Sequence, residues 1–398
     1  MRVLSLLLAV TLVVPALAAQ SRLGPVEKRP KLQAGADTND AGAYFAHASR
    51  VLEDKPEEAA RAFYWAARLD PSSADALDGR RAAVLLRRQP TLRLYMEGGR
   101  RARESKELRA LDSLAMRATR LDPLYYRKYD HTLLMAYYRN MLRAANPTVS
   151  TADIDHEIRT YLTTGSAYMR GWLAYGEGRF PAALEHYEAA AAKSKYPGGI
   201  RLERARIMAL QGMFPRAIAE FRVASELLSK SEQDKDEDIV FYNSRAMVEH
   251  SIGIVYSHLA QMDSARAALG RAITEDLSYF MGHVDLGKLA LVAKDTATAI
   301  SELALAADLA SDEPYVHYLN GNILLAAGQH TDAIAAFRKA IALEPLHALS
   351  HFELALALDR SGDKPGALAS YQKFLSMAPI REVRRRAEAN ERVAALKQ

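Results

Sequence analysis

Three histidines recur at a fixed interval along the chain, and a ladder of imidazoles is a pattern that can ligate metal ions. The three are His283, His317 and His351, and the two intervals between them are equal. If each lies on the equivalent helix of a repeating unit, neighbouring side chains are on the order of 10 Å apart, because that is the usual packing distance between helices. One metal ion cannot be shared over that distance. We therefore interpret the three histidines as core or interface side chains and predict no metal site.

The remaining candidates for chemistry lack the spacing that catalysis or phosphate binding requires. His131 and His156 are not part of an HExxH pattern, which would place two imidazoles over a zinc ion. Gly98–Gly99 is followed by arginines instead of the Lys-Ser of a phosphate-binding loop, and no GxSxG nucleophile motif occurs. The pair Glu57–Glu58 is interpreted as surface charge at a helix start. We predict that the chain is not an enzyme and holds no cofactor; an active site within residues 124–163 is the alternative.

Composition places the chain among ordinary globular proteins. Of its 398 residues, 49% are hydrophobic and 25% are charged. The absence of cysteine excludes disulfides, thiolate zinc sites and the lipid-bearing cysteine of a bacterial lipoprotein. The net charge of +5 is small for this length, and no long basic tract occurs. We therefore expect no nucleic-acid partner.

Residues 1–19 have the order of a secretory signal peptide. Arg2 supplies the positive start, an apolar stretch follows from residue 3 to 14, and small residues stand at Ala16 and Ala18. This pattern predicts cleavage near Ala18 or Ala19 and a mature protein in the periplasm or outside the cell. We expect no stable membrane insertion after cleavage. The alternative is an uncleaved anchor, because the apolar stretch approaches membrane-spanning length.

Residues 20–39 are predicted to form a flexible lead-in, and helical periodicity begins at residue 40. In the second half of the chain the same residue types return after one constant period. Small residues at such positions let two antiparallel helices approach, and an aromatic ring or leucine fills the gap that remains. The anchors Gly321, Gly328, Ala333, Phe337 and Pro345 recur one period later as Ala355, Gly362, Ala367, Tyr371 and Pro379.

This pattern resembles the tetratricopeptide repeat, a helix-turn-helix unit of about 34 residues. The resemblance implies an all-α fold, a right-handed superhelical solenoid of antiparallel helix pairs, and a protein that binds other molecules. A charged segment at residues 229–238 interrupts the register and is interpreted as a solvated loop, with a docking insert as the alternative. The predicted units cover residues 164–197, 198–231, 246–279, 280–313, 314–347 and 348–379, and residues 380–398 are predicted to form a capping helix.

Residues 40–163 match the repeat pattern less well and are predicted to form a divergent helical region of the same type. Ala74–Arg88 and Lys106–Arg120 have the periodicity of an amphipathic helix pair, separated by an insertion. Leu124–Ala145 is predicted to be a tyrosine-rich helix, and Ala152–Thr163 a shorter one.

In the family that the chain resembles, the first helix of each unit lines a concave groove through its second, fifth, ninth and twelfth positions. In this sequence those positions are largely aromatic and apolar, which suits a helix or an extended peptide with hydrophobic anchors. Chaperone-binding members hold a terminal carboxylate with a lysine and asparagine clamp, of which only Asn322 has a counterpart here. The residues at groove positions are Tyr168, Trp172, Tyr175, Leu202, Arg206, His250, Ile254, Val284, Tyr315, Tyr318, Asn322 and Phe352.

The functional hypothesis is an exported scaffold or adaptor that binds protein or peptide segments in this groove. Two alternatives stay open. The first is that the aromatic side chains contact a neighbouring helix or a long terminal extension of the same chain. The second is an envelope structural or assembly factor that acts by self-association or by contact with the cell wall. The sequence does not determine the partner or the oligomeric state.

Overall fold

The computed structural model describes residues 23, 26–124, 128–231 and 244–398, and its regular secondary structure in these ranges is entirely helical. The predicted signal peptide and most of the charged segment at residues 229–238 lie outside the described residues. No helix in the described ranges is both long enough and apolar enough to cross a membrane.

The second part of the chain is a regular stack of helix pairs, which we call the repeat array. Each unit predicted from the sequence period contains one pair, and a last helix follows in the predicted cap. The helices are α9 (Ala167–Gly176), α10 (Phe180–Ala191), α11 (Gly198–Leu210), α12 (Phe214–Ser231), α13 (Arg245–His258), α14 (Met262–Glu275), α15 (Phe280–Val292), α16 (Thr296–Leu309), α17 (Pro314–Ala326), α18 (His330–Leu343), α19 (Ala348–Ser361), α20 (Lys364–Met377) and α21 (Val383–Leu396).

The small anchor residues let the helices of a pair make close contact, as the spacing predicts. A Cβ atom added at Gly321 would lie 2.5 Å from the Phe337 ring, which real side chains do not tolerate. The turn between the same two helices needs a glycine for another reason, because Gly328 has a φ of +76°. Successive pairs bury their apolar faces against one another, and one apolar core extends from Ala246 to Ala389, with smaller clusters in the earlier repeats.

The first part of the chain, which we call the N-terminal region, is also helical but less regular. Helices α1 and α2 form a pair, and α3 packs on α6 across an insertion that forms the short helices α4 and α5. The helices are α1 (Ala41–Val51), α2 (Pro56–Leu69), α3 (Ala74–Leu86), α4 (Gln89–Glu97), α5 (Gly99–Glu104), α6 (Lys106–Leu121), α7 (Asp130–Ala145) and α8 (Thr151–Thr164).

Two sequence expectations for the N-terminal region need correction. The helix expected from Leu124 begins only at Asp130, because Asp122 accepts the Leu124 backbone N–H at 3.0 Å and directs the chain into a turn. Residues 20–39 were expected to be a flexible lead-in, but their described part contacts the helices of the N-terminal region. Trp65 donates its indole N–H to the Glu27 carbonyl at 3.0 Å.

A fully buried charge network holds α3 and α7 together in the N-terminal region. The Arg81 guanidinium binds Asp78 at 2.6 Å and Asp130 at 2.8 Å, and each of the three side chains is at most 4% exposed. Arg81 also donates to the Tyr95 hydroxyl at 2.8 Å. Two carboxylates around one guanidinium satisfy the buried charges, which would otherwise carry a large desolvation cost.

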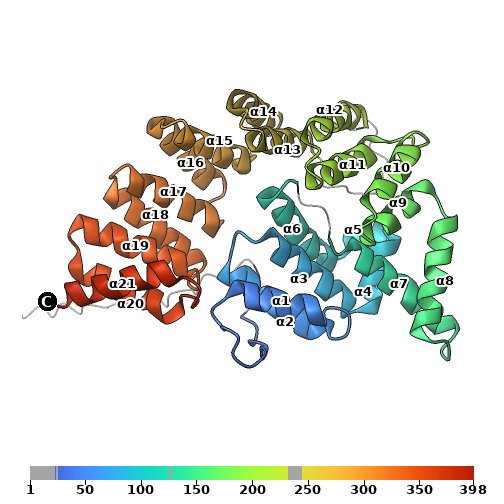
Figure 1. Cartoon of the computed structure of the whole chain (residues 1–398), viewed down its shortest axis with the longest axis horizontal. Coiled ribbons are helices and arrows are strands. Elements are labelled where there is room, and N and C mark those ends of the chain that lie inside the picture. The colour runs from blue at the N-terminus through green and yellow to red at the C-terminus, as the bar shows by residue number, and fades with distance from the viewer. Residues whose placement is uncertain (1–22, 24–25, 125–127, 232–243) are drawn as a thin grey trace, which may run out of the picture.

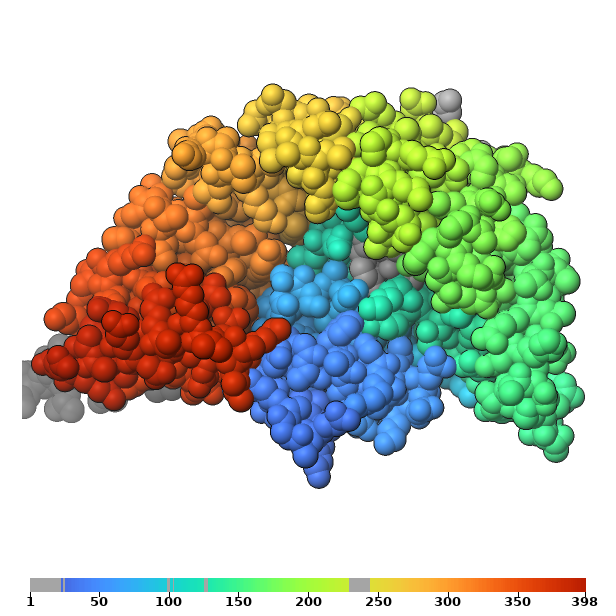
Figure 2. Space-filling model, in the orientation of Figure 1, coloured from blue at the N-terminus to red at the C-terminus, as the bar shows by residue number. Residues whose placement is uncertain are grey.

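The repeat array curves into an arch, and the N-terminal region lies inside that arch (Figure 1). Helices α1, α2, α3 and α6 lie on the inner side of α13–α19, and α8 is at the outer edge where the two parts join. Figure 2 shows the blue N-terminal helices in contact with the red C-terminal ones, so the chain closes on itself. The Arg381–Asp40 ion pair, at 3.1 Å, lies at this closure.

Candidate binding groove

The residues at predicted groove positions lie in helices α9, α11, α13, α15, α17 and α19, which are the first helices of the six pairs. Leu202, Arg206, His250, Val284 and Phe352 are buried, so they cannot contact a partner in this conformation. The other positions, which are half-buried, are Tyr168, Trp172, Tyr175, Ile254, Tyr315, Tyr318 and Asn322.

The aromatic cluster predicted at the start of the groove contacts neighbouring helices of the same chain. Tyr168 packs on the ring of Tyr187 in α10, with ring centroids 5.6 Å apart. Trp172 packs against the apolar cluster of α7 and α8, which includes Ile154 and Ile158. Burial raises the pKa of the Tyr175 hydroxyl. This end of the groove is therefore covered by α7 and α8, one of the two alternatives that the sequence left open.

The middle of the groove holds a backbone carbonyl from the end of α6. Arg206 on α11 donates its Nε–H to the Pro123 carbonyl oxygen at 3.2 Å. The Ser251 hydroxyl on α13 lies 3.2 Å from the same oxygen and 2.9 Å from the Met247 carbonyl oxygen of its own helix, so these two acceptors share its one hydrogen. Leu124 packs against the apolar core of α11–α13. Two successive repeats of the array thus bind one segment of the N-terminal region by its main chain and by an apolar side chain.

A polar network joins α13 to α15 next to this contact. His250 is fully buried, with Nδ1 2.9 Å from the Tyr279 hydroxyl and Nε2 2.6 Å from Asp285. Burial alone would raise the pKa of Asp285, but the hydrogen bond from His250 and the nearby charges of His250 and Lys288 lower it to about 2. Both ring nitrogens of His250 are engaged, so neither is available to act as a base. The network serves to bridge the two helices.

At the far end of the groove, aromatic rings meet the start of α19. Tyr318 packs edge-on against His347 with ring centroids 4.9 Å apart. Phe352 is buried between Tyr371 and Phe374 of α20. Burial lowers the pKa of His347 to about 4, so this imidazole is neutral at physiological pH.

Charged contacts fasten the N-terminal region to successive repeats. Arg117 on α6 binds Glu313 with two hydrogen bonds of 2.6 and 2.8 Å. Arg68 at the end of α2 binds Glu344 in the same two-pronged manner, with hydrogen bonds of 2.8 and 3.1 Å. Arg120, three positions after Arg117, lies 6.0 Å from the Phe280 ring centroid. We call Arg68–Glu344 and Arg117–Glu313 the latch pairs.

Sequence reasoning missed the latch pairs, although the sequence carries a partial signal for one of them. Arg117 and Arg120 lie on the side of α6 away from Leu108, because nine and twelve residues at about 100° each place them a half and a third of a turn around the helix from it. This two-faced pattern indicates a helix that packs on one side and offers cations on the other. It does not identify Glu313 as the acceptor, because the two residues are 196 positions apart.

The three periodic histidines occupy equivalent places in their repeats. His317 Nε2 is 3.0 Å from the Ser311 carbonyl oxygen, and His351 Nε2 is 3.1 Å from that of Pro345, at the same sequence separation in both cases. His283 instead pairs with Glu302 on its own second helix at 2.7 Å. Each contact lies within the array, as the interpretation of core or interface side chains requires. Among the residues that the structure describes, no cluster of three or more metal-ligating side chains occurs.

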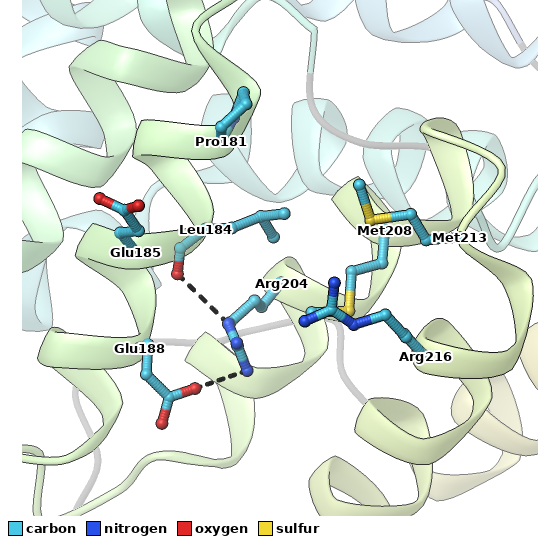
Figure 3. A pocket seen from close by; sticks show the side chains of 8 residues that line it. All are labelled: Pro181, Leu184, Glu185, Glu188, Arg204, Met208, Met213 and Arg216. Atoms are coloured by element: carbon cyan, nitrogen blue, oxygen red, sulfur yellow. Dashed lines mark hydrogen bonds and ion pairs between the residues drawn. The ribbon is translucent and has the colours of Figure 1, made fainter.

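A pocket of about 430 Å³ lies on the opposite face of α11, and sequence reasoning did not identify it (Figure 3). Arg204 and Met208 line the pocket, whereas Leu202 and Arg206 are at groove positions; residues two apart on a helix point about 200° apart. Its floor is apolar, and Arg204 crosses it to bind Glu188 at 2.6 Å. The lining consists of Pro181, Leu184, Glu185, Glu188, Arg204, Met208, Met213 and Arg216.

Comparison with known proteins gives a family for the repeat array. The family model described as tetratricopeptide repeat matches residues 168–231 and 318–379. No curated protein matches the chain. The match includes the first two and the last two predicted repeats, so these four units are similar in sequence to tetratricopeptide repeats.

Solved structures with a similar fold share little sequence with this chain. YrrB, whose structure is described as that of a TPR protein with an unusual peptide-binding site, is 18% identical with a TM-score of 0.39, over 49% of this chain and 94% of that one. MamA is 19% identical with a TM-score of 0.37, over 45% and 91%. The C-terminal part of a TPR protein from Cytophaga hutchinsonii is 16% identical with a TM-score of 0.43, over 53% and 78%.

Proposed function

Because the chain carries tetratricopeptide repeats, we propose that it is an exported scaffold that binds segments of other proteins in the concave groove of its array. The observation that carries this proposal is the hydrogen bond from Arg206 to the Pro123 carbonyl oxygen, beside the Ser251 hydroxyl at 3.2 Å from the same atom. A main-chain carbonyl is a group that every protein ligand possesses. The groove has the donors to hold one, with an apolar surface beside them for the following side chain.

The half-buried aromatic residues of α17 support the same proposal. Tyr315, Tyr318 and Asn322 lie at groove positions and keep part of their surface exposed. Tyrosine combines a large apolar area with a polar tip and loses little conformational entropy on binding, which makes it a frequent contact residue in interfaces.

The test is site-specific photo-crosslinking in envelope extract. A photo-reactive amino acid at Tyr315 is expected to give adducts with a discrete set of proteins. The matched control is the same amino acid at Arg338, an exposed position on α18, the second helix of the same repeat. Equal adducts at both positions, or none at Tyr315, contradict the groove as the binding surface.

Export is a separate part of the proposal and rests on the order of residues 1–19. Cell fractionation of a chain tagged at its C-terminus, followed by intact-mass measurement, tests it. We expect the protein in the periplasm or the medium, beginning at Ala19 or Gln20. A cytoplasmic chain that retains residues 1–19 contradicts this part and leaves the groove proposal untouched.

A further inference from the structure

The latch pairs are buried. Their burial determines whether they stabilise the closed form or mainly fix the position of the N-terminal region. In the Arg68–Glu344 pair the side chains are 7% and 5% exposed, and Glu313 is 1% exposed in its pair with Arg117. Burying an ion pair costs desolvation energy that is approximately repaid by the attraction between the charges. Separation of the two parts returns all four charges to water. The latch pairs therefore set the docking geometry while adding little net stability to the closed form.

The other contacts between the two parts are polar pairs and single apolar side chains; the polar ones include Arg381–Asp40 at 3.1 Å and the Ile380 N–H bonded to Asp37 at 2.6 Å. Helix packing in the described chain runs almost entirely between neighbours within each part, and no extensive helix-on-helix contact joins α6 to the array. The apolar contribution comes from single side chains. Leu121 packs against the cores of both parts, and Leu346 of the array packs against the N-terminal core. Interfaces of this polar, small kind are typical of domains that move relative to one another.

The segment that fills the groove has a definite chemistry. It is the end of a helix that bears Arg117 and Arg120, followed by an extended turn that contains Pro123 and Leu124. Every one of these four residues contacts the array. Arg117 binds Glu313, Arg120 faces Phe280, the Pro123 carbonyl accepts a hydrogen bond from Arg206, and the half-buried Leu124 packs against the α11–α13 core. The segment thus contacts three successive predicted repeats, from Arg206 in the second to Phe280 and Glu313 in the fourth.

We infer that the end of α6 is an intramolecular ligand of the groove, and that the partner is a protein segment with the same chemistry. This partner segment ends a helix with an arginine, continues into a leucine-proline turn, and displaces the N-terminal region when it binds. The inference rests on the proposed function, which it deepens by naming the class of partner and the device that regulates access. Isolated chains are closed, and the partner shifts the population toward the open form.

The test uses a variant that opens the latch from the N-terminal side and leaves the groove glutamates in place. R68Q/R117Q removes both cations, so Glu344 and Glu313 are buried without a counter-charge unless the ring opens. The probe is a fluorescent peptide with the sequence of residues 112–124. By fluorescence anisotropy we expect it to bind R68Q/R117Q at least tenfold more tightly than the wild-type chain. The control R266Q/R392Q removes two arginines from ion pairs within the array and is expected to bind like wild type.

Two further measurements separate specific binding from partial unfolding. Adding Glu313→Gln to the open variant is expected to weaken peptide binding about tenfold, because the peptide arginine loses its acceptor. A peptide whose arginine at the position of Arg117 is replaced by glutamine is expected to lose affinity to the same degree. A partly unfolded protein that binds peptides non-specifically is expected to bind equally well with Glu313 or glutamine, and with or without the peptide arginine.

The inference is overturned if R68Q/R117Q binds the peptide no better than wild type, or if binding does not depend on Glu313. If those results occur while the photo-crosslinker at Tyr315 still captures partners, the groove binds proteins of another chemistry. In that case the intramolecular ligand is rejected and the proposed function stands. Absence of both crosslinks and peptide binding rejects the two together.

Discussion

The N-terminal region and the repeat array are both built from paired helices in which a glycine packs on an aromatic ring, but the N-terminal region adds a buried arginine held between two carboxylates. In the array, a glycine facing an aromatic ring or a leucine recurs, as in Gly321 on Phe337 and Gly287 on Leu303. In the N-terminal region, α3 and α7 are joined by the buried charges of Arg81, Asp78 and Asp130. The same kind of interaction, a buried arginine with a carboxylate, then joins this region to the array. Regular packing extends the array, and specific charge pairs fix the irregular part against it.

The largest expected effect is that of Arg81→Met, which leaves Asp78 and Asp130 buried without their cation. Breaking a buried ion pair from one side costs about 3–5 kcal/mol, so the free energy of unfolding of the N-terminal region falls by that amount. Hydrogen exchange is the measurement. Protection in α3 and α7 is expected to fall while α13–α20 are unchanged.

Arg392→Met is the control for Arg81→Met, because Arg392 pairs with Asp359 inside the array but is 41% exposed. Such a pair contributes at most about 1 kcal/mol. Equal losses in the two variants would mean that buried charge is not what distinguishes the N-terminal region.

A smaller effect is expected on acidification, at the place where the two parts meet. His347 is neutral in the fold because burial lowers its pKa to about 4 from an ordinary value of 6.5. The stability that neutral His347 confers is full above pH 6.5 and is lost as the pH falls toward 4, by about 3 kcal/mol in total. Asp285, whose pKa is lowered to about 2, loses its contribution only below pH 3.8 and does not contribute in this window.

Urea unfolding at pH 7 and pH 4.5, for wild type and His347→Gln, measures this effect. Wild type is expected to lose about 2–3 kcal/mol more than the variant between the two pH values. Parallel losses would show that acid sensitivity resides elsewhere in the chain.

The smallest expected effect concerns the close contact between the two helices of a pair in the array. Gly321→Ala places a Cβ atom 2.5 Å from Phe337 and is expected to destabilise the array by about 1–3 kcal/mol. Gly270→Ala is the matched control, because no atom lies within 4 Å of its added Cβ. In a helix interior this change stabilises by about 0.5–1 kcal/mol. Thermal unfolding of both variants is the check, and shifts of the same sign would contradict the packing argument.

The fold of the array could be predicted because its contacts are local. Gly321 and Phe337 belong to the two helices of one pair, and the same relation returns in the next repeat as Ala355 and Tyr371, so the spacing alone carries the geometry. The start of α7 was placed too early because the periodicity of Leu124–Ala145 does not reveal that Asp122 forms a turn. Local side-chain to backbone bonds of this kind compete with helix formation.

The sequence could not predict in the same way that a segment of the same chain fills the groove. Arg206, at a predicted groove position of α11, contacts a segment of the same chain, and partner binding at these positions stays a prediction. Arg206 is 83 positions away from the residue it contacts there. The two residues of each latch pair are 196 and 276 positions apart. No local pattern encodes such pairings, because they depend on how the arch curves as a whole.

The central claim is that the N-terminal region closes the inner face of the array, and a distance measurement by pulsed electron spin resonance tests it most directly. The chain has no cysteine, so pairs of spin labels can be placed at will. Ala110 on α6 and Ala326 on α17 are exposed, as is Ala394 on α21. For the pair 110–326, we predict one narrow distance distribution, like that of the array-internal pair 326–394. A broad distribution for 110–326 beside a narrow one for 326–394 would contradict the closed ring.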